Sequence, residues 1–265
     1  MHWLLLRGLG REQRHWYDFP DFMRRALQPD QLVLLDLAGA GTERERLPRP
    51  SVPWLARDVA DRLQRLPFVR AAEPKPARER GWGVIGLSLG GMVALELCWL
   101  LPHRFAQAVI INSSARISAP SARLERRALA PLGQVLLAAD ALERETRLLD
   151  LTSELPPAER RRCAERAALL GRDGRVRGPA FLAQLCAAAR FVPPPPGSLS
   201  AGLCFLGARG DLLVSSRCSR DLALRYGAPY LEHPWAGHDL PLDDPAWVCR
   251  QIAACHVAVT RHLAV

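Results

Sequence analysis

The sequence predicts an α/β protein with a mostly parallel sheet of about six strands, flanked by helices and interrupted by a helical cap. Short apolar runs alternate with stretches of helical length. This alternation stops in the middle of the chain and resumes after a run of four prolines at 193–196. A chain of 265 residues can bury the core of one such domain. We expect residues 1–116 and 198–265 to form the core, and residues 117–197 to form the cap, or lid.

The first part of the chain carries most of the expected sheet. Apolar runs that end at glycine or at polar residues predict strands at 3–7, 32–37, 82–87 and 105–112. Apolar residues at helical spacing predict helices at 13–27, 51–65 and 89–101. Ser51 and Pro53 suit the start of the second helix. The polar, proline-containing stretch 73–80 predicts a loop.

The second part begins with helices and then returns to alternation. Residues 117–190 are rich in Leu, Ala and Arg and show no clear strand pattern. After the prolines we expect strands at 203–207 and 229–233 and helices at 215–226 and 245–263. Strands that alternate with helices usually pair in parallel, so the two parts should share one sheet.

The composition excludes several classes of protein. The formal net charge is +9, and Lys75 is the only lysine, but the arginines are scattered rather than gathered in a nucleic-acid-binding stripe. No apolar run approaches the ~20 residues that span a bilayer. The apolar stretch formed by the first residues is too short for a secretory leader, so we expect a cytoplasmic protein. We also expect a monomer or a homodimer. The seven cysteines include no C-x-x-C pair, which indicates reduced core thiols and neither a disulfide framework nor a metal site. We expect no cofactor.

The segment Gly86-Leu87-Ser88-Leu89-Gly90 joins an expected strand to an expected helix. A tight turn at this junction raises the serine hydroxyl above the sheet and places a helix N-terminus behind it. Ser88 is therefore the candidate nucleophile, and the Leu89 amide is a candidate oxyanion donor. The alternative is a helix start whose small residues merely pack on the sheet.

A serine nucleophile needs a base and an acid that orients the base. In folds with this turn, both come later in the chain, in loops that follow strands. His238 comes shortly after the last expected strand, and Asp211 follows the preceding one. Asp239 lies beside the base on the chain, where we expect a surface or helix-capping role. The stretch after the strand at 105–112 reads Asn-Ser-Ser and offers no carboxylate.

The remaining polar candidates are weaker. The other histidines do not fall in a loop after the last strand: they are His2, His15, His103, His233, His256 and His262. We expect His233 to end that strand, and Asp243 or Asp244 to cap the helix that begins at Pro245. After the first strand, Arg7-Gly8-Leu9-Gly10 offers the Leu9 amide as the second oxyanion donor, with Trp16 packed beneath the loop.

These motifs resemble those of the α/β-hydrolase superfamily over residues 2–115 and 198–263. In layout the chain is similar to small capped carboxylesterases such as the pimeloyl-acyl-carrier-protein methyl ester carboxylesterases. Their His-Gly-x-Gly, Gly-x-Gly and Gly-x-Ser-x-Gly-Gly motifs correspond to residues 7–10, 39–41 and 86–91. The resemblance implies a Ser88, Asp211 and His238 triad, with Leu9 and Leu89 at the oxyanion hole. Arg7 replaces the usual His, and Ala38 the usual Pro.

The resemblance implies acyl transfer to water, while the cap decides the substrate. Apolar cap residues either line an acyl pocket or bury the cap against the core; they include Leu124, Leu129, Leu132, Val135, Leu136 and Leu137. Basic cap residues either receive an acidic acyl carrier protein or face solvent; they include Arg160, Arg161, Arg162 and Arg166. The leading expectation is a carboxylesterase for short- to medium-chain acyl esters of small molecules. A thioesterase or acyltransferase for carrier-bound acyl groups, and a non-catalytic ligand-binding protein, are the alternatives.

Overall fold

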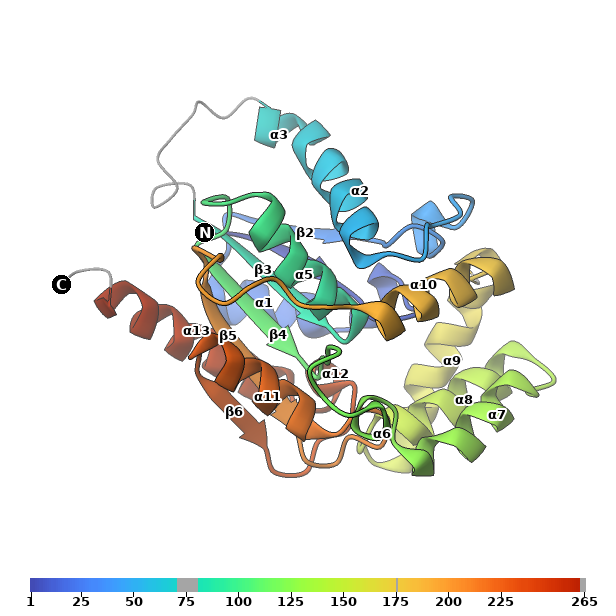
Figure 1. Ribbon diagram of the computed structural model, residues 1–265. Helices are drawn as coiled ribbons and strands as arrows, with labels where there is room; N and C mark the ends of the chain where they lie inside the picture. Colours follow the sequence, from blue (N-terminus) through green and yellow to red (C-terminus); the bar gives the residue numbers. More distant parts are fainter. Residues whose placement is uncertain (71–80, 175, 263–265) are drawn as a thin grey trace.

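The computed structural model describes residues 1–70, 81–174 and 176–262 (Figure 1). The loop expected at 73–80 lies outside these residues. The six strands form one sheet in the order β2-β1-β3-β4-β5-β6, and every neighbouring pair is parallel. The strands are β1 (His2–Leu6), β2 (Gln31–Leu35), β3 (Trp82–Leu87), β4 (Gln107–Ile111), β5 (Gly202–Ala208) and β6 (Tyr230–His233). The expected sheet is confirmed.

Helices cover both faces of the sheet. One face packs against α2 (Val52–Arg65), α5 (Leu89–Leu100) and α11 (Ser216–Tyr226). The other face packs against α1 (Phe19–Leu27) and α13 (Pro245–His262). β3 is buried along its whole length because it lies inside the sheet with helices on both sides. The short helices α3 (Pro67–Arg70) and α12 (Leu240–Asp243) and the 3-10 turn η2 (Gly41–Glu43) lie in connections.

Between β4 and β5, the regular elements of the described residues are all helical. They are α6 (Pro120–Arg123), η3 (Arg126–Ala128), α7 (Leu129–Leu136), α8 (Ala141–Thr152), α9 (Pro157–Gly174) and α10 (Gly178–Arg190). In Figure 1, α7, α8 and α9 gather to one side of the sheet. Hydrogen bonds tie this segment to the loops that follow the strands: Gln184 Oε1 accepts from the Gly10 amide at 3.0 Å, and the Asp239 amide donates to Thr152 O at 2.7 Å.

Several expected elements are shorter than the sequence pattern indicated, including the strand expected at 105–112, which spans Gln107–Ile111. The structure shows the cause for two of them. The helix expected at 13–27 is divided into η1 (Gln13–Trp16) and α1, because Tyr17 adopts a positive φ of 48° and Pro20 follows in the first turn of α1. The strand expected at 32–37 ends at Leu35. The side chain of the next residue, Asp36, accepts from the Gln13 and Thr42 amides at 2.6 and 2.9 Å and so fixes a turn.

The cysteines correct one expectation. Cys204 on β5 and Cys255 on α13 form a disulfide, so the prediction of reduced thiols is wrong for this pair. The two residues are 51 positions apart and meet because α13 packs across β5, which local spacing does not reveal. The other five cysteines are free and are buried or half-buried. Among the described helices, none has the length and apolarity to cross a membrane.

Candidate active site

Ser88 lies at a sharp turn between β3 and α5. Its backbone has a φ of 57° and a ψ of −119°, which a non-glycine residue adopts only under constraint from its surroundings. Gly90 provides the room, because a Cβ there would overlap the carbonyl oxygen of Leu6 on the neighbouring strand. Ser88 is half-buried while the residues on either side of it are buried. The turn therefore presents this serine above the sheet.

The carboxyl end of β4 anchors both the serine turn and the histidine loop. The Ser88 amide donates to Ile111 O at 2.9 Å. The next residue, Asn112, donates from its side-chain amide to the carbonyl oxygens of Gly237 and His238 at 3.2 and 2.8 Å. Two consecutive residues thus hold the nucleophile and base candidates to one strand end.

Asp211 and His238 form a buried pair in the loops after β5 and β6. The Nδ1 atom of His238 lies 2.6 Å from Oδ2 of Asp211. The other oxygen, Oδ1, accepts from the Leu213 and Val214 amides at 2.8 and 2.9 Å, which fixes the carboxylate. Burial alone lowers the pKa of His238. The charge and hydrogen bond of Asp211, with a contribution from Asp239, outweigh burial and leave that pKa raised. An ionised Asp211 selects the tautomer that carries the proton on Nδ1 and leaves Nε2 free to accept one.

Of the two predicted oxyanion residues, Leu89 directly follows Ser88, and Leu9 belongs to a loop that approaches it. Leu89 is the first residue of α5, where a helix leaves its amides without intrahelical acceptors. Leu9 lies in the loop after β1, and this loop approaches the serine closely: a Cβ on Gly8 would be 3.1 Å from the Ser88 Cβ. Their assignment as oxyanion donors stays a prediction.

Asp239 differs from its expected surface or capping role. It is buried, makes no side-chain cap, and forms a two-pronged ion pair with Arg7 at 2.7 and 2.8 Å. Trp16, expected beneath the loop, is buried with the Arg7 guanidinium 4.9 Å from its ring centre. Asp244 does cap α13, because it accepts from the Trp247 amide at 2.8 Å.

Sequence reasoning missed the roles of Asn112 and Gln184. In the sequence, Asn112 stands out only because it is not a carboxylate, yet its side chain holds the histidine loop. Its positive φ of 44° in a position that follows a strand is a feature that asparagine tolerates well. Gln184 on α10 is fully buried. Its Oε1 accepts from the Gly10 amide, and its Nε2 donates to Ala38 O at 2.9 Å. Its partners are more than 140 positions away, so spacing gave no sign of them.

The rival histidines occupy other surroundings. His233 ends β6, as expected, and its Nδ1 accepts from the Ala236 amide at 3.0 Å. His15 is buried in η1, and burial lowers its pKa strongly. Among the described residues, no group of three or more His, Cys, Asp or Glu side chains is arranged to hold a metal ion.

Many of the apolar and basic side chains between β4 and β5 are exposed, and Arg161, Arg162 and Arg166 face solvent, as one of the two expectations has it. Four of the six apolar residues are exposed, by 40 to 83 %: Leu124, Leu129, Leu136 and Leu137. These four leucines are not among the described residues that pack in the two core clusters. Three of the four arginines pair with carboxylates, namely Arg160 with Asp150, Arg161 with Glu165 and Arg166 with Asp18.

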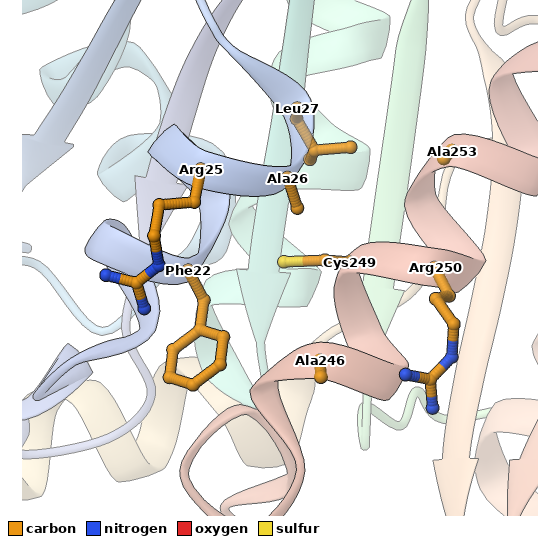
Figure 2. A pocket seen from close by; sticks show the side chains of 8 residues that line it. All are labelled: Phe22, Arg25, Ala26, Leu27, Ala246, Cys249, Arg250 and Ala253. Carbon is orange, nitrogen blue, oxygen red and sulfur yellow. The ribbon is translucent and has the colours of Figure 1, made fainter.

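A separate groove of about 360 Å³ lies between α1 and α13 (Figure 2). Phe22 and Arg25 line it from α1, and Cys249 and Arg250 line it from α13. No predicted site residue takes part, so the groove is distinct from the cluster around Ser88.

Known proteins with solved structures resemble the whole chain in fold. A bacterial membrane phospholipase A, described as a virulence factor, is 19% identical with a TM-score of 0.72, over 98% of this chain and 79% of that one. A thermophilic esterase from Thermogutta terrifontis is 19% identical, with a TM-score of 0.69 and coverage of 98% and 90%. An enol-lactonase from Burkholderia xenovorans is 16% identical, with a TM-score of 0.68 and coverage of 96% and 91%. No curated protein sequence matches significantly.

A family model agrees with these structural likenesses and spans nearly all of the chain. The model described as "Alpha/beta hydrolase family" matches residues 3–251, which include the strand ends, the serine turn and the loops of Asp211 and His238. The chain belongs to the alpha/beta hydrolase family.

Proposed function

We propose that this protein is a serine carboxylesterase that hydrolyses short- to medium-chain acyl esters of small molecules through an acyl-enzyme. The observation that carries the proposal is the buried Asp211–His238 pair, held by β4 at the same strand end as the constrained turn of Ser88. Structural neighbours named as an esterase, a phospholipase A and an enol-lactonase agree with this class of reaction.

In the proposed mechanism, Nε2 of His238 takes the hydroxyl proton as Ser88 Oγ attacks the ester carbonyl carbon. Asp211 holds the imidazole through Nδ1 and stabilises its cationic form. The amides of Leu9 and Leu89 donate to the oxyanion, and His238 then protonates the leaving alcohol. Water, deprotonated by His238, attacks the acyl-enzyme, and the acid is released as Ser88 recovers its proton.

We further propose that residues 117–197 act as the cap of this site. The support is the set of contacts between this segment and the site loops, including Gly10 with Gln184 and Asp239 with Thr152. A buried ion pair at 2.6 Å joins Arg11, in the loop of Leu9, to Glu145 on α8. Such a cap restricts water and shapes the acyl site. With Arg160, Arg161 and Arg166 in ion pairs, no observation favours an acyl carrier protein over a small ester.

The test is hydrolysis of p-nitrophenyl esters of increasing acyl length by the wild-type protein and by Ser88→Ala. Removing the hydroxyl removes the nucleophile, so we expect activity to fall to background while the circular dichroism spectrum and melting temperature stay unchanged. Ser198→Ala is the matched control, because its hydroxyl donates to Pro195 O at 2.7 Å in an exposed loop ahead of β5 and has no part in the proposed chemistry. Full activity in Ser88→Ala would exclude the proposal.

A further inference from the structure

A buried ion pair lies beside the proposed triad and takes no direct part in its chemistry. Arg7 Nη1 and Nη2 donate to Asp239 Oδ1 and Oδ2 at 2.8 and 2.7 Å. Both side chains are about 95% buried. Burying two charges costs solvation energy, which this planar, two-pronged geometry offsets. A buried pair therefore adds little net stability over apolar residues of the same volume, but it fixes two pieces of backbone precisely.

The surroundings leave Arg7 with one strong anchor. Its guanidinium packs on the Trp16 ring at 4.9 Å. Among the described atoms, its Nε has no hydrogen-bond acceptor. The carboxylate of Asp239 thus decides where the guanidinium lies.

The two partners come from the two loops that the proposed mechanism must align. Arg7 directly precedes Gly8 and Leu9, in the loop that touches Ser88. Asp239 directly follows His238, and its amide is also held by Thr152 O. They are 232 positions apart in the chain, and the ion pair joins the two loops directly.

We infer that Arg7 and Asp239 are positioning residues, whose ion pair sets the Leu9 amide and the His238 imidazole at the separation that acyl transfer at Ser88 requires. This inference rests on the proposed function. The pair acts through its neighbours, since each partner fixes the backbone next to a reacting group. A displacement of such a group by about 1 Å costs up to about 100-fold in rate.

The pair also affects the charge of the base. The charged groups that act on His238 are Asp211, from the loop after β5, Asp239, from its own loop, and Arg7, from the loop after β1. Both carboxylates favour the imidazolium and Arg7 opposes it. Removing only the charge of Asp239 should therefore lower the pKa of His238.

The first experiment replaces the whole pair in Arg7→Met/Asp239→Leu. A single apolar substitution would leave an unpaired buried charge and destabilise the fold, whereas the double variant leaves none. We expect a melting temperature near that of the wild type, an unchanged KM, and a fall of about 10- to 100-fold in both kcat and the rate of fluorophosphonate labelling of Ser88. The matched control is Arg24→Met/Asp21→Leu, which removes an exposed ion pair on α1 and should leave the rates unchanged.

The second experiment uses Asp239→Asn, which keeps an oxygen that can accept from Arg7. An NMR titration of the His238 imidazole should give a lower pKa than in the wild type. This shift would show that the Asp239 charge acts on the base, which a pair that only fills space would not do. This readout needs no turnover.

Wild-type rates in the folded double variant would overturn the inference, and so would an unchanged His238 titration in Asp239→Asn. Failure of the proposed function is a different result, in which wild-type Ser88 itself does not label. If the double variant does not fold, the His238 titration and the Ser88 labelling rate of Asp239→Asn test the inference instead.

Discussion

Ser88 is held in a backbone conformation that costs on the order of 1–3 kcal/mol for a residue with a side chain. The surrounding contacts impose it: Ile111 O accepts from its amide, and Ser113 Oγ donates to its carbonyl. A serine in a relaxed helix start would need no such conformation. At the scale of single residues, this strain favours the nucleophile over a packing role.

The acid of the proposed triad can be tested at the same scale. Asp211→Asn keeps the side-chain shape but removes the charge that selects the His238 tautomer, so we expect kcat to fall on the order of 10³- to 10⁴-fold. Asp221→Asn is the matched control; Asp221 lies on α11 and accepts from the Ser118 hydroxyl at 2.6 Å. Steady-state kinetics on one p-nitrophenyl ester measure both variants.

The same assay should distinguish the roles of the two carboxylates near His238, Asp211 and Asp239, by the activity that each substitution removes. Asp239→Asn should lose far less activity than Asp211→Asn, because only Asp211 contacts the imidazole at Nδ1. The reverse order would show that Asp239 is the acid of the triad.

Some site residues could be predicted from the sequence because strand ends in a parallel sheet share one edge. Ser88, Asp211 and His238 each follow an expected strand, and the structure brings the last two into contact. Asp239 could not be placed this way. Its side-chain direction depends on the turn that it occupies, and its partner Arg7 lies at the other end of the chain.

Among the secondary-structure elements, the contact between β1 and the start of α5 decides whether the serine turn can form. A Cβ on Gly90 would overlap the Leu6 carbonyl oxygen and would also approach that of Arg7. Both are backbone atoms of the central sheet or of the loop that follows it, and they cannot move without disturbing the site. Only glycine allows the helix to begin this close to the strand.

Two glycine substitutions test this contact. Gly90→Ala should destabilise the protein by on the order of 2–4 kcal/mol because backbone must shift. The matched control is Gly133→Ala in the interior of α7, where an added Cβ meets nothing within 4 Å. It should stabilise the protein by about 0.5–1 kcal/mol, because alanine restricts the unfolded chain and favours the helix. Urea denaturation gives both values, and a neutral Gly90→Ala would show that the close approach is absent.

Helix and strand periodicity predicted every strand of the sheet but not each boundary. The break at Tyr17 depends on a positive φ at that residue, which the apolar spacing of 13–27 does not reveal. The end of β2 depends on hydrogen bonds from Gln13 and Thr42 to Asp36. The first boundary is a single-residue backbone feature and the second arises from contacts between segments, and apolar spacing carries no information about either.

At the scale of the whole molecule, long-range contacts determine what the sequence left open. The Cys204–Cys255 disulfide joins β5 to α13, and Gln184 joins the segment between β4 and β5 to two site loops. The fold class could be predicted because strands and helices alternate repeatedly along the chain. These single contacts are not repeated, so they became visible only in the folded chain.

The most direct test of the central claim is to treat the wild-type protein with a fluorophosphonate and map the adduct by peptide mass spectrometry. The claim is that the fold activates one serine at the turn between β3 and α5. The account predicts one adduct per chain, on Ser88, formed rapidly at neutral pH and lost in Ser88→Ala. No adduct, or an adduct on another residue, would contradict it.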